Sequence, residues 1–126
     1  MLSNAPVSAI LPTTDLERSK KFYTETLGLN EMPGSVEGFA MFGAGAGTTL
    51  AVYERAPVTI EHTQAGFLVE NIEEEVKTLK AKGVTFEEYD LPEIKTVDGI
   101  ATMEGVKSAW FKDPDGNILN VVNQMG

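Results

Sequence analysis

The chain has 126 residues, 42% of them hydrophobic and 23% charged, which is the composition of a globular domain and not of a disordered segment. Its formal net charge of −9 argues against nucleic acids and anionic membranes as partners, because both attract basic protein surfaces. The sequence contains no cysteine, which excludes disulfide bonds, thiolate metal ligands and thiol nucleophiles.

The N-terminal segment predicts no secretory signal. Residues Met1–Pro6 lack a basic stretch followed by an apolar one. No apolar stretch in the chain is long enough to span a bilayer. We therefore expect a soluble, cytoplasmic protein.

The first half of the chain predicts one helix among several strands. Asp15 can cap a helix that continues through Leu27 and stops at Gly28, the residue type that most readily adopts a left-handed conformation. The glycine-rich stretch Gly43–Gly47 joins two strands and therefore predicts a hairpin turn, not a phosphate-binding loop. The predicted strands are Val7–Thr13, Phe39–Phe42 and Thr48–Tyr53.

The second half predicts the same order of elements. Asn71 and Glu74 form a pair similar to a capping box at the start of a helix that ends at Gly83. The sequence Asp-Pro-Asp-Gly at 113–116 predicts a tight turn. The stretch Glu88–Glu104 is irregular, and its length makes it a candidate lid or rim. The predicted strands are Gln64–Val69, Val84–Glu88, Ser108–Phe111 and Asn117–Val122.

The two predicted helices belong to an internal repeat. Their caps, Asp15 and Asn71, are 56 positions apart, and their final glycines are 55 positions apart. This spacing is too long for a solenoid and suits two copies of a βαβββ module. We therefore expect an α+β fold in which two modules form a cup. One domain would cover residues 1–126, with module one at 5–54, a linker at 55–63 and module two at 64–124.

Several stretches carry a family resemblance. They are Ala109–Leu119, Asp15–Ser19 with Phe22-Tyr23 and Leu27-Gly28-Leu29, and Val69–Ile72 with Lys82-Gly83-Val84. In this order they resemble the vicinal oxygen chelate superfamily, which includes glyoxalase I, bleomycin-resistance proteins and extradiol dioxygenases. The resemblance extends from Val7 to Val122. It implies paired βαβββ modules with a curved mixed sheet around a cavity, often in a homodimer.

The resemblance also identifies the positions at which enzymes of the family hold a metal ion. In this chain those positions are Ser8, Leu50, Gln64 and Asn120. None of these residues is charged, whereas such metal sites need three or four carboxylate, imidazole or thiolate donors. A register shift of two residues would bring the single histidine, His62, to the site, but without a carboxylate partner. We therefore expect no bound metal and no cofactor.

The expected ligand cup is lined by the same residues and by the only tryptophan, so that the predicted set is Ser8, Leu50, Gln64, Trp110 and Asn120. Trp110 can form an aromatic wall or, alternatively, belong to the core. The amide side chains need hydrogen-bond partners, which a ligand could supply. No catalytic residue is identified. The acidic residues of the second half form either a solvated surface or a rim that attracts a cation.

The favoured hypothesis is a bleomycin-resistance-like homodimer that binds a small organic ligand, for which the acidic charge favours a cation. One alternative is a glyoxalase- or isomerase-like lyase, similar to lactoylglutathione lyase, with a displaced metal site or metal-independent chemistry around His62. Another is a partner-binding protein in which the cup is vestigial.

Overall fold

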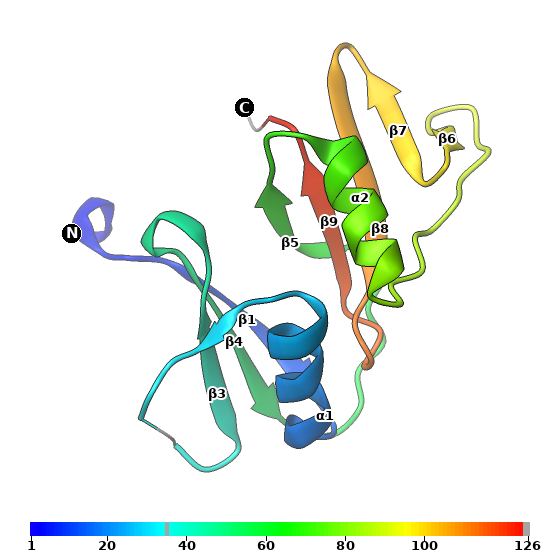
Figure 1. The fold of residues 1–126 in the computed structure, drawn as a ribbon. Coiled ribbons are helices and arrows are strands. Elements are labelled where there is room, and N and C mark those ends of the chain that lie inside the picture. Colours follow the sequence, from blue (N-terminus) through cyan, green and yellow to red (C-terminus); the bar gives the residue numbers. More distant parts are fainter. Residues whose placement is uncertain (35, 125–126) are drawn as a thin grey trace. The chain divides into compact units, whose positions relative to one another are not determined.

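The computed structural model describes residues 1–34 and 36–124 and divides the chain into two compact units, Met1–Thr59 and Ile60–Gly126 (Figure 1). Each unit contains one sheet, and each follows a strand–helix–strands order. The predicted α+β class and the paired βαβββ arrangement are therefore confirmed. Among the described residues, no helix is long and apolar enough to cross a membrane.

The first unit is a four-stranded sheet with the strand order β1-β4-β3-β2. Strand β1 runs parallel to β4, and the other pairs are antiparallel. A short 3₁₀ turn, η1 (Leu2–Asn4), precedes the sheet, and another, η3 (Gly45–Gly47), joins β3 to β4 at the predicted hairpin turn. The remaining elements are β1 (Ser8–Thr13), α1 (Leu16–Lys21), η2 (Phe22–Thr26), β2 (Asn30–Glu31), β3 (Phe39–Gly43) and β4 (Thr49–Glu54).

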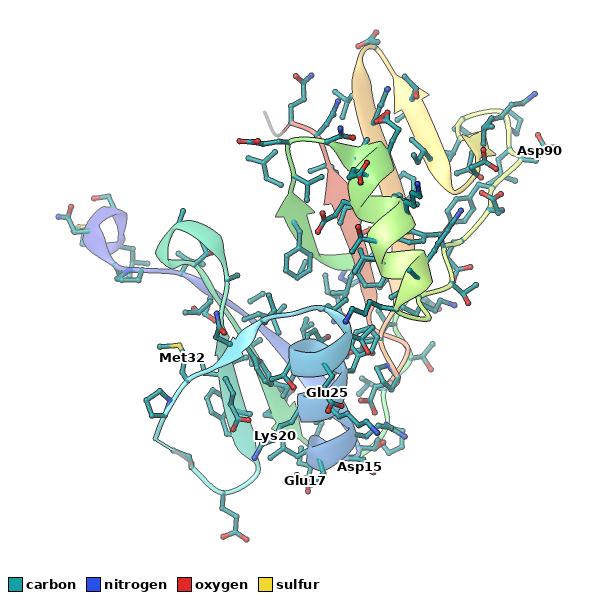
Figure 2. All side chains as sticks on the ribbon, in the orientation of Figure 1. Asp15, Glu17, Lys20, Glu25, Met32 and Asp90 are labelled. Atoms are coloured by element: carbon teal, nitrogen blue, oxygen red, sulfur yellow. The ribbon has the colours of Figure 1, made fainter. Side chains whose placement is uncertain are left out.

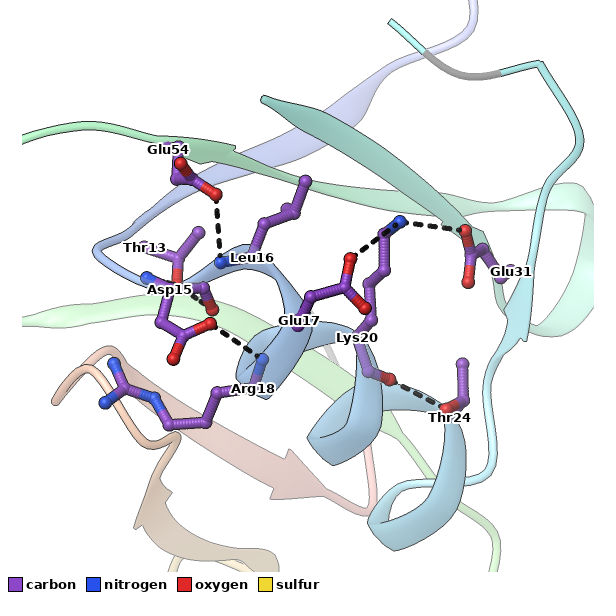
Figure 3. Close-up of polar contacts among 9 residues, drawn as sticks. All are labelled: Thr13, Asp15, Leu16, Glu17, Arg18, Lys20, Thr24, Glu31 and Glu54. Carbon is purple, nitrogen blue, oxygen red and sulfur yellow. Dashed lines mark hydrogen bonds and ion pairs between the residues drawn. The ribbon is translucent and has the colours of Figure 1, made fainter. Parts of the chain in front are cut away.

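The start of α1 is fixed by two carboxylates. The side chain of Asp15 accepts a hydrogen bond from the Arg18 amide at 3.2 Å, and Oε2 of Glu54 accepts one from the Leu16 amide at 3.2 Å (Figure 3). These acceptors satisfy amides that have no partner within the helix, and their charge complements the positive end of the helix dipole. The predicted cap at Asp15 is therefore confirmed, and Glu54 adds a tie from the helix to β4.

The first helix is not α-helical along its whole predicted length. It continues after Lys21 as the π-helical turn η2, in which the Leu27 amide bonds the Phe22 carbonyl five positions earlier. The Thr24 hydroxyl donates to the Lys20 carbonyl at 2.7 Å (Figure 3), which competes with the regular backbone bond at this point. Gly28, at φ 78°, ends the segment as predicted.

The second unit is a five-stranded sheet with the order β5-β9-β8-β7-β6, and β5 runs parallel to β9. Asn71 caps α2 by accepting a hydrogen bond from the Glu74 amide at 3.1 Å, as predicted. The apolar stripe of α2 is buried at Ile72, Val76 and Leu79. The elements are β5 (Thr63–Leu68), α2 (Ile72–Ala81), β6 (Thr96–Val97), β7 (Ile100–Met103), β8 (Val106–Lys112) and β9 (Ile118–Val122).

Two predictions for the stretch between α2 and β8 are wrong. The stretch Glu88–Glu104 is not simply irregular, because it contains the β6–β7 hairpin, which extends the sheet beyond β8. Gly99, at φ 83°, permits the tight turn, and its amide donates to Oε1 of Glu88 at 2.6 Å. Conversely, the predicted strand Val84–Glu88 is reduced to a single bridge between Phe86 and Phe111.

The side of each sheet that faces its helix is set by strand register. In the first sheet Phe42 pairs with Leu50 and stacks on the buried ring of Tyr23 at a centroid distance of 5.5 Å. In the second sheet the buried side chains of Ala109 and Val121 are register partners. Because side chains alternate along a strand, the intervening residues point to the opposite side, away from the helix.

The predicted turn at 113–116 is confirmed and is built around one buried carboxylate. Asp113 is 4% exposed. Its Oδ1 accepts hydrogen bonds from the amides of Asp115 and Asn117, each at 2.9 Å, and its Oδ2 accepts one from Nδ2 of Asn117 at 2.8 Å. The aspartate therefore holds the β8–β9 hairpin closed.

Replacing Asp113 with alanine should lower the free energy of unfolding by about 2 to 4 kcal/mol, because it leaves buried donors without an acceptor. Asp90 is the matched control, since its side chain is 91% exposed and lies at the outer edge of the second unit (Figure 2). The D90A variant should unfold within about 0.5 kcal/mol of the parent. Chemical denaturation of both variants checks this, and equal losses would contradict the assigned role of Asp113.

Candidate functional site

Two residues of the predicted ligand set lie side by side in the second unit. Trp110 of β8 and Asn120 of β9 are direct register partners, so their side chains share one side of the sheet. That side is opposite to the one that packs on α2, because Ala109 and Val121 occupy the alternate positions. Nε1 of Trp110 donates to Oγ1 of Thr63 at 3.2 Å, which fixes the indole toward β5. We call this side of the second sheet the tryptophan face.

Tyr89 adds a second aromatic ring to the tryptophan face. Its ring meets that of Trp110 edge to face, with centroids 5.7 Å apart and planes at 82°, a geometry that aromatic quadrupoles favour. The chain around Tyr89 is held against the sheet because the Glu87 amide donates to the Trp110 carbonyl at 2.8 Å and the Thr96 hydroxyl accepts from the Tyr89 amide at 2.8 Å. Tyr89 is not recognisable as a site residue from the sequence, since only this long-range pairing brings it to Trp110.

The electrostatics of the aromatic pair follow from its surroundings. Burial raises the pKa of the Tyr89 phenol above its ordinary value, and the nearby carboxylate of Glu87 raises it further. Glu87 itself forms an ion pair with Lys112, with Oε1 and Nζ 3.8 Å apart. The tryptophan face therefore has an acidic group next to its aromatic rings.

Gln64 lies at an irregularity in β5. Thr63 pairs with Ile118, and Ala65 pairs with Leu119, so β5 has one residue more than β9 at this point. Gln64 is the extra residue, which makes this irregularity a β-bulge. Its side-chain Oε1 is buried and has no hydrogen-bond partner within the described residues. On the same strand Gly66 is the register partner of Asn120, so no side chain of β5 stands beside that amide.

The first unit does not join Ser8 and Leu50 as predicted. Ser8 pairs with Thr49, whereas Leu50 pairs with Ala9, so the two side chains point to opposite sides of the sheet. Leu50 is 3% exposed and belongs to the core on the helix side. Its assignment to the lining of a cup shared with Ser8 is therefore wrong by one position along the strand. The Ser8 hydroxyl donates to the carbonyl of Ala9 at 3.2 Å.

The residues at the metal positions of the resemblance do not fit a metal centre. Correcting the register by one residue replaces Leu50 with Thr49 or Ala51, and neither supplies a carboxylate or imidazole. Within residues 1–34 and 36–124, no three His, Cys, Asp or Glu side chains come together in a group that could hold a metal ion. His62 is exposed and lies just before β5.

Sequence comparison identifies one family. Residues 6–121 match the family model described as the Glyoxalase/Bleomycin resistance protein/Dioxygenase superfamily. No curated protein matches the chain by sequence.

Comparison with solved structures supports the same fold. A putative glyoxalase family protein from Bacillus anthracis is 20% identical, with a TM-score of 0.71 over 94% of this chain and 93% of that one. The fosfomycin resistance protein FosX from Listeria monocytogenes is 18% identical, with a TM-score of 0.69 over 97% and 92%. The oxidase ChaP-H2 is 24% identical, with a TM-score of 0.69 over 95% and 93%. These three proteins are named for different functions. The structural likeness therefore shows a shared fold and not a shared function.

Replacing Glu87 with glutamine should lower the pKa of Tyr89 toward its ordinary value, because the negative charge that opposes the tyrosinate is removed. Ultraviolet titration of tyrosinate measures this, and the Y89F variant identifies the Tyr89 transition among the three tyrosines. Since the folded pKa lies above the unfolded one, the associated stabilisation is present at lower pH and is lost as the pH rises through the folded pKa. An unchanged Tyr89 transition in E87Q would contradict the described environment.

Proposed function

This chain belongs to the Glyoxalase/Bleomycin resistance protein/Dioxygenase superfamily, and from that premise we propose that it binds a small organic cation on the tryptophan face without a metal ion or cofactor. The proposal is of the bleomycin-resistance type, in which the protein sequesters its ligand. It includes the expectations of a homodimer and of a cytoplasmic location.

The observation that carries the proposal is the buried side-chain oxygen of Gln64, which has no hydrogen-bond partner in the part of the chain that the structure describes. Buried polar atoms are nearly always hydrogen-bonded, and an unsatisfied one costs about 1 to 3 kcal/mol. An amide oxygen can only accept, so the group that completes it must be a donor. A protonated amine supplies N–H donors and makes the stronger, charge-assisted kind of hydrogen bond.

The aromatic pair supports a cationic ligand on independent grounds. A cation near the face of a tryptophan or tyrosine ring is attracted by the ring quadrupole, by about 0.5 to 2 kcal/mol depending on burial. Trp110 and Tyr89 provide two such rings, and the Glu87 carboxylate lies near Tyr89, where its charge is partly offset by the ion pair with Lys112. The net charge of −9 would also draw cations toward the protein.

The amide side chain of Asn120 and the description of the family both support a small-molecule ligand. Asn120, between Trp110 and Gly66, offers both a donor and an acceptor next to a position without a side chain. One structural neighbour is a fosfomycin resistance protein, and the family name includes bleomycin resistance. Resistance to small organic molecules is therefore a function found on this fold.

We expect bleomycin, which is cationic, or the simpler phenethylammonium to quench the fluorescence of Trp110 and to release heat in calorimetry with one ligand per tryptophan face. The decrease in tryptophan fluorescence reports on Trp110 alone, because the chain has no other tryptophan. Replacing Gln64 with leucine should weaken binding about tenfold, because the ligand donor then loses a charge-assisted hydrogen bond. W110L should weaken binding in calorimetry by about three- to thirtyfold.

The matched control is Gln124→Leu, the same substitution at an exposed glutamine, which should bind like the parent. Equal weakening in Q64L and Q124L would contradict the assignment of the site. The absence of heat with either cation would contradict the proposed ligand class. Stoichiometric nickel, zinc, manganese or iron in protein purified without chelator would contradict metal-independent function.

A further inference from the structure

A single helix cannot cover the helix side of the second sheet. Strands lie about 4.8 Å apart, so five of them span roughly 20 Å, whereas a helix with its side chains is about 10 to 12 Å wide. The α2 helix lies over β8 and β9, and the β6–β7 hairpin extends beyond it (Figure 1). The space between α2 and the hairpin is a groove of about 630 Å³.

Part of the lining of this groove is apolar. Val76 comes from α2, and Val97 and Ile100 are register partners in the β6–β7 hairpin, so their side chains share the side of the sheet that carries the helix. The full lining is Glu73, Val76, Lys77, Lys80, Lys95, Val97, Asp98, Ile100, Thr102 and Lys107. We call it the lysine groove. It lies within the second unit and on the opposite side of the sheet from Trp110.

The charge of the lysine groove is opposite to that of the whole protein. Four of the chain's ten basic side chains line it, against two carboxylates, which gives the lining a formal charge of +2 in a protein of −9. One carboxylate is already paired, since Nζ of Lys107 lies 2.6 Å from Oε1 of Glu73. This hydrogen bond lowers the pKa of Glu73. The excess positive charge of the groove therefore comes from its other three lysines.

The remaining lysines are available to a ligand. Among the described residues Lys77 forms no ion pair, and Nζ of Lys80 donates only to the backbone carbonyl of Asp98 at 3.3 Å. Lys95 lies 3.8 Å from Asp90, but both side chains are largely exposed, so this pair contributes little and is easily exchanged. A groove lined by both apolar side chains and ammonium groups is complementary to an anion that carries an apolar body.

We infer that the lysine groove is a second ligand site, which takes a small organic anion with an apolar body such as a hydrophobic sulfonate or carboxylate. The apolar body would lie on Val97 and Ile100, and the anionic group would lie between the ammonium groups of Lys77 and Lys80. The site is independent of the tryptophan face, so either can fail without the other.

The test uses two fluorescent probes that share one apolar body. The probe 8-anilinonaphthalene-1-sulfonate carries the anion, and N-phenyl-1-naphthylamine lacks it. The sulfonate should bind the parent protein with a blue-shifted emission, and K77Q/K80Q should weaken it at least fivefold. Because Lys80 also contacts Asp98, K77Q alone is the second variant and should weaken binding at least twofold without loss of thermal stability. The neutral probe should bind the parent and these variants equally weakly.

The matched control is Lys82→Gln, which removes a charge just after α2 but outside the groove lining. K82Q should bind the sulfonate like the parent. Equal weakening in K82Q and K77Q would overturn the inference, since it would show only the effect of net charge. No binding of the sulfonate to the folded parent, or binding lost in W110L and kept in K77Q/K80Q, would overturn it as well.

Discussion

The structure depends on the packing of each sheet against a single helical segment, which buries the side chains on that side of the sheet. Burial of that side stabilises each unit, and strand register decides whether a side chain packs toward the helix or points away from it. Trp110 and Asn120 point away from α2 because Ala109 and Val121 occupy the alternate positions. Leu50 points toward the helix for the same reason.

Local signals predicted much of the fold. The caps at Asp15 and Asn71, the glycine ends and the Asp113 turn each depend on short-range hydrogen bonds or backbone preference, and the structure has all of them. The phase of β4 could not be predicted, because Leu50, Ala51 and Val52 are all buried and the strand does not alternate. An apolar run without alternation does not indicate which of its residues face the helix.

Most of the candidate site depends on contacts that are distant in sequence. Tyr89 reaches Trp110 through backbone pairing between the stretch after α2 and β8, and the pattern of the sequence does not encode this partner. The bulge at Gln64 is a relation between two strands and is invisible in either strand alone. The lysine groove likewise requires the β6–β7 hairpin, which the sequence predicted as an irregular stretch. Trp110 stands out in the sequence as the only tryptophan and Asn120 through the family resemblance, and the structure pairs them across β8 and β9.

The two sides of the second sheet differ in chemistry, with aromatic rings and an acidic neighbour on one and lysines beside apolar side chains on the other. We propose that a cation binds on the tryptophan face. The most direct test is fluorine NMR of protein labelled with 5-fluorotryptophan, which reports Trp110 alone. We expect this resonance to shift progressively with phenethylammonium and to saturate at the affinity measured by calorimetry. A resonance that stays unmoved while calorimetry detects binding would contradict this proposal.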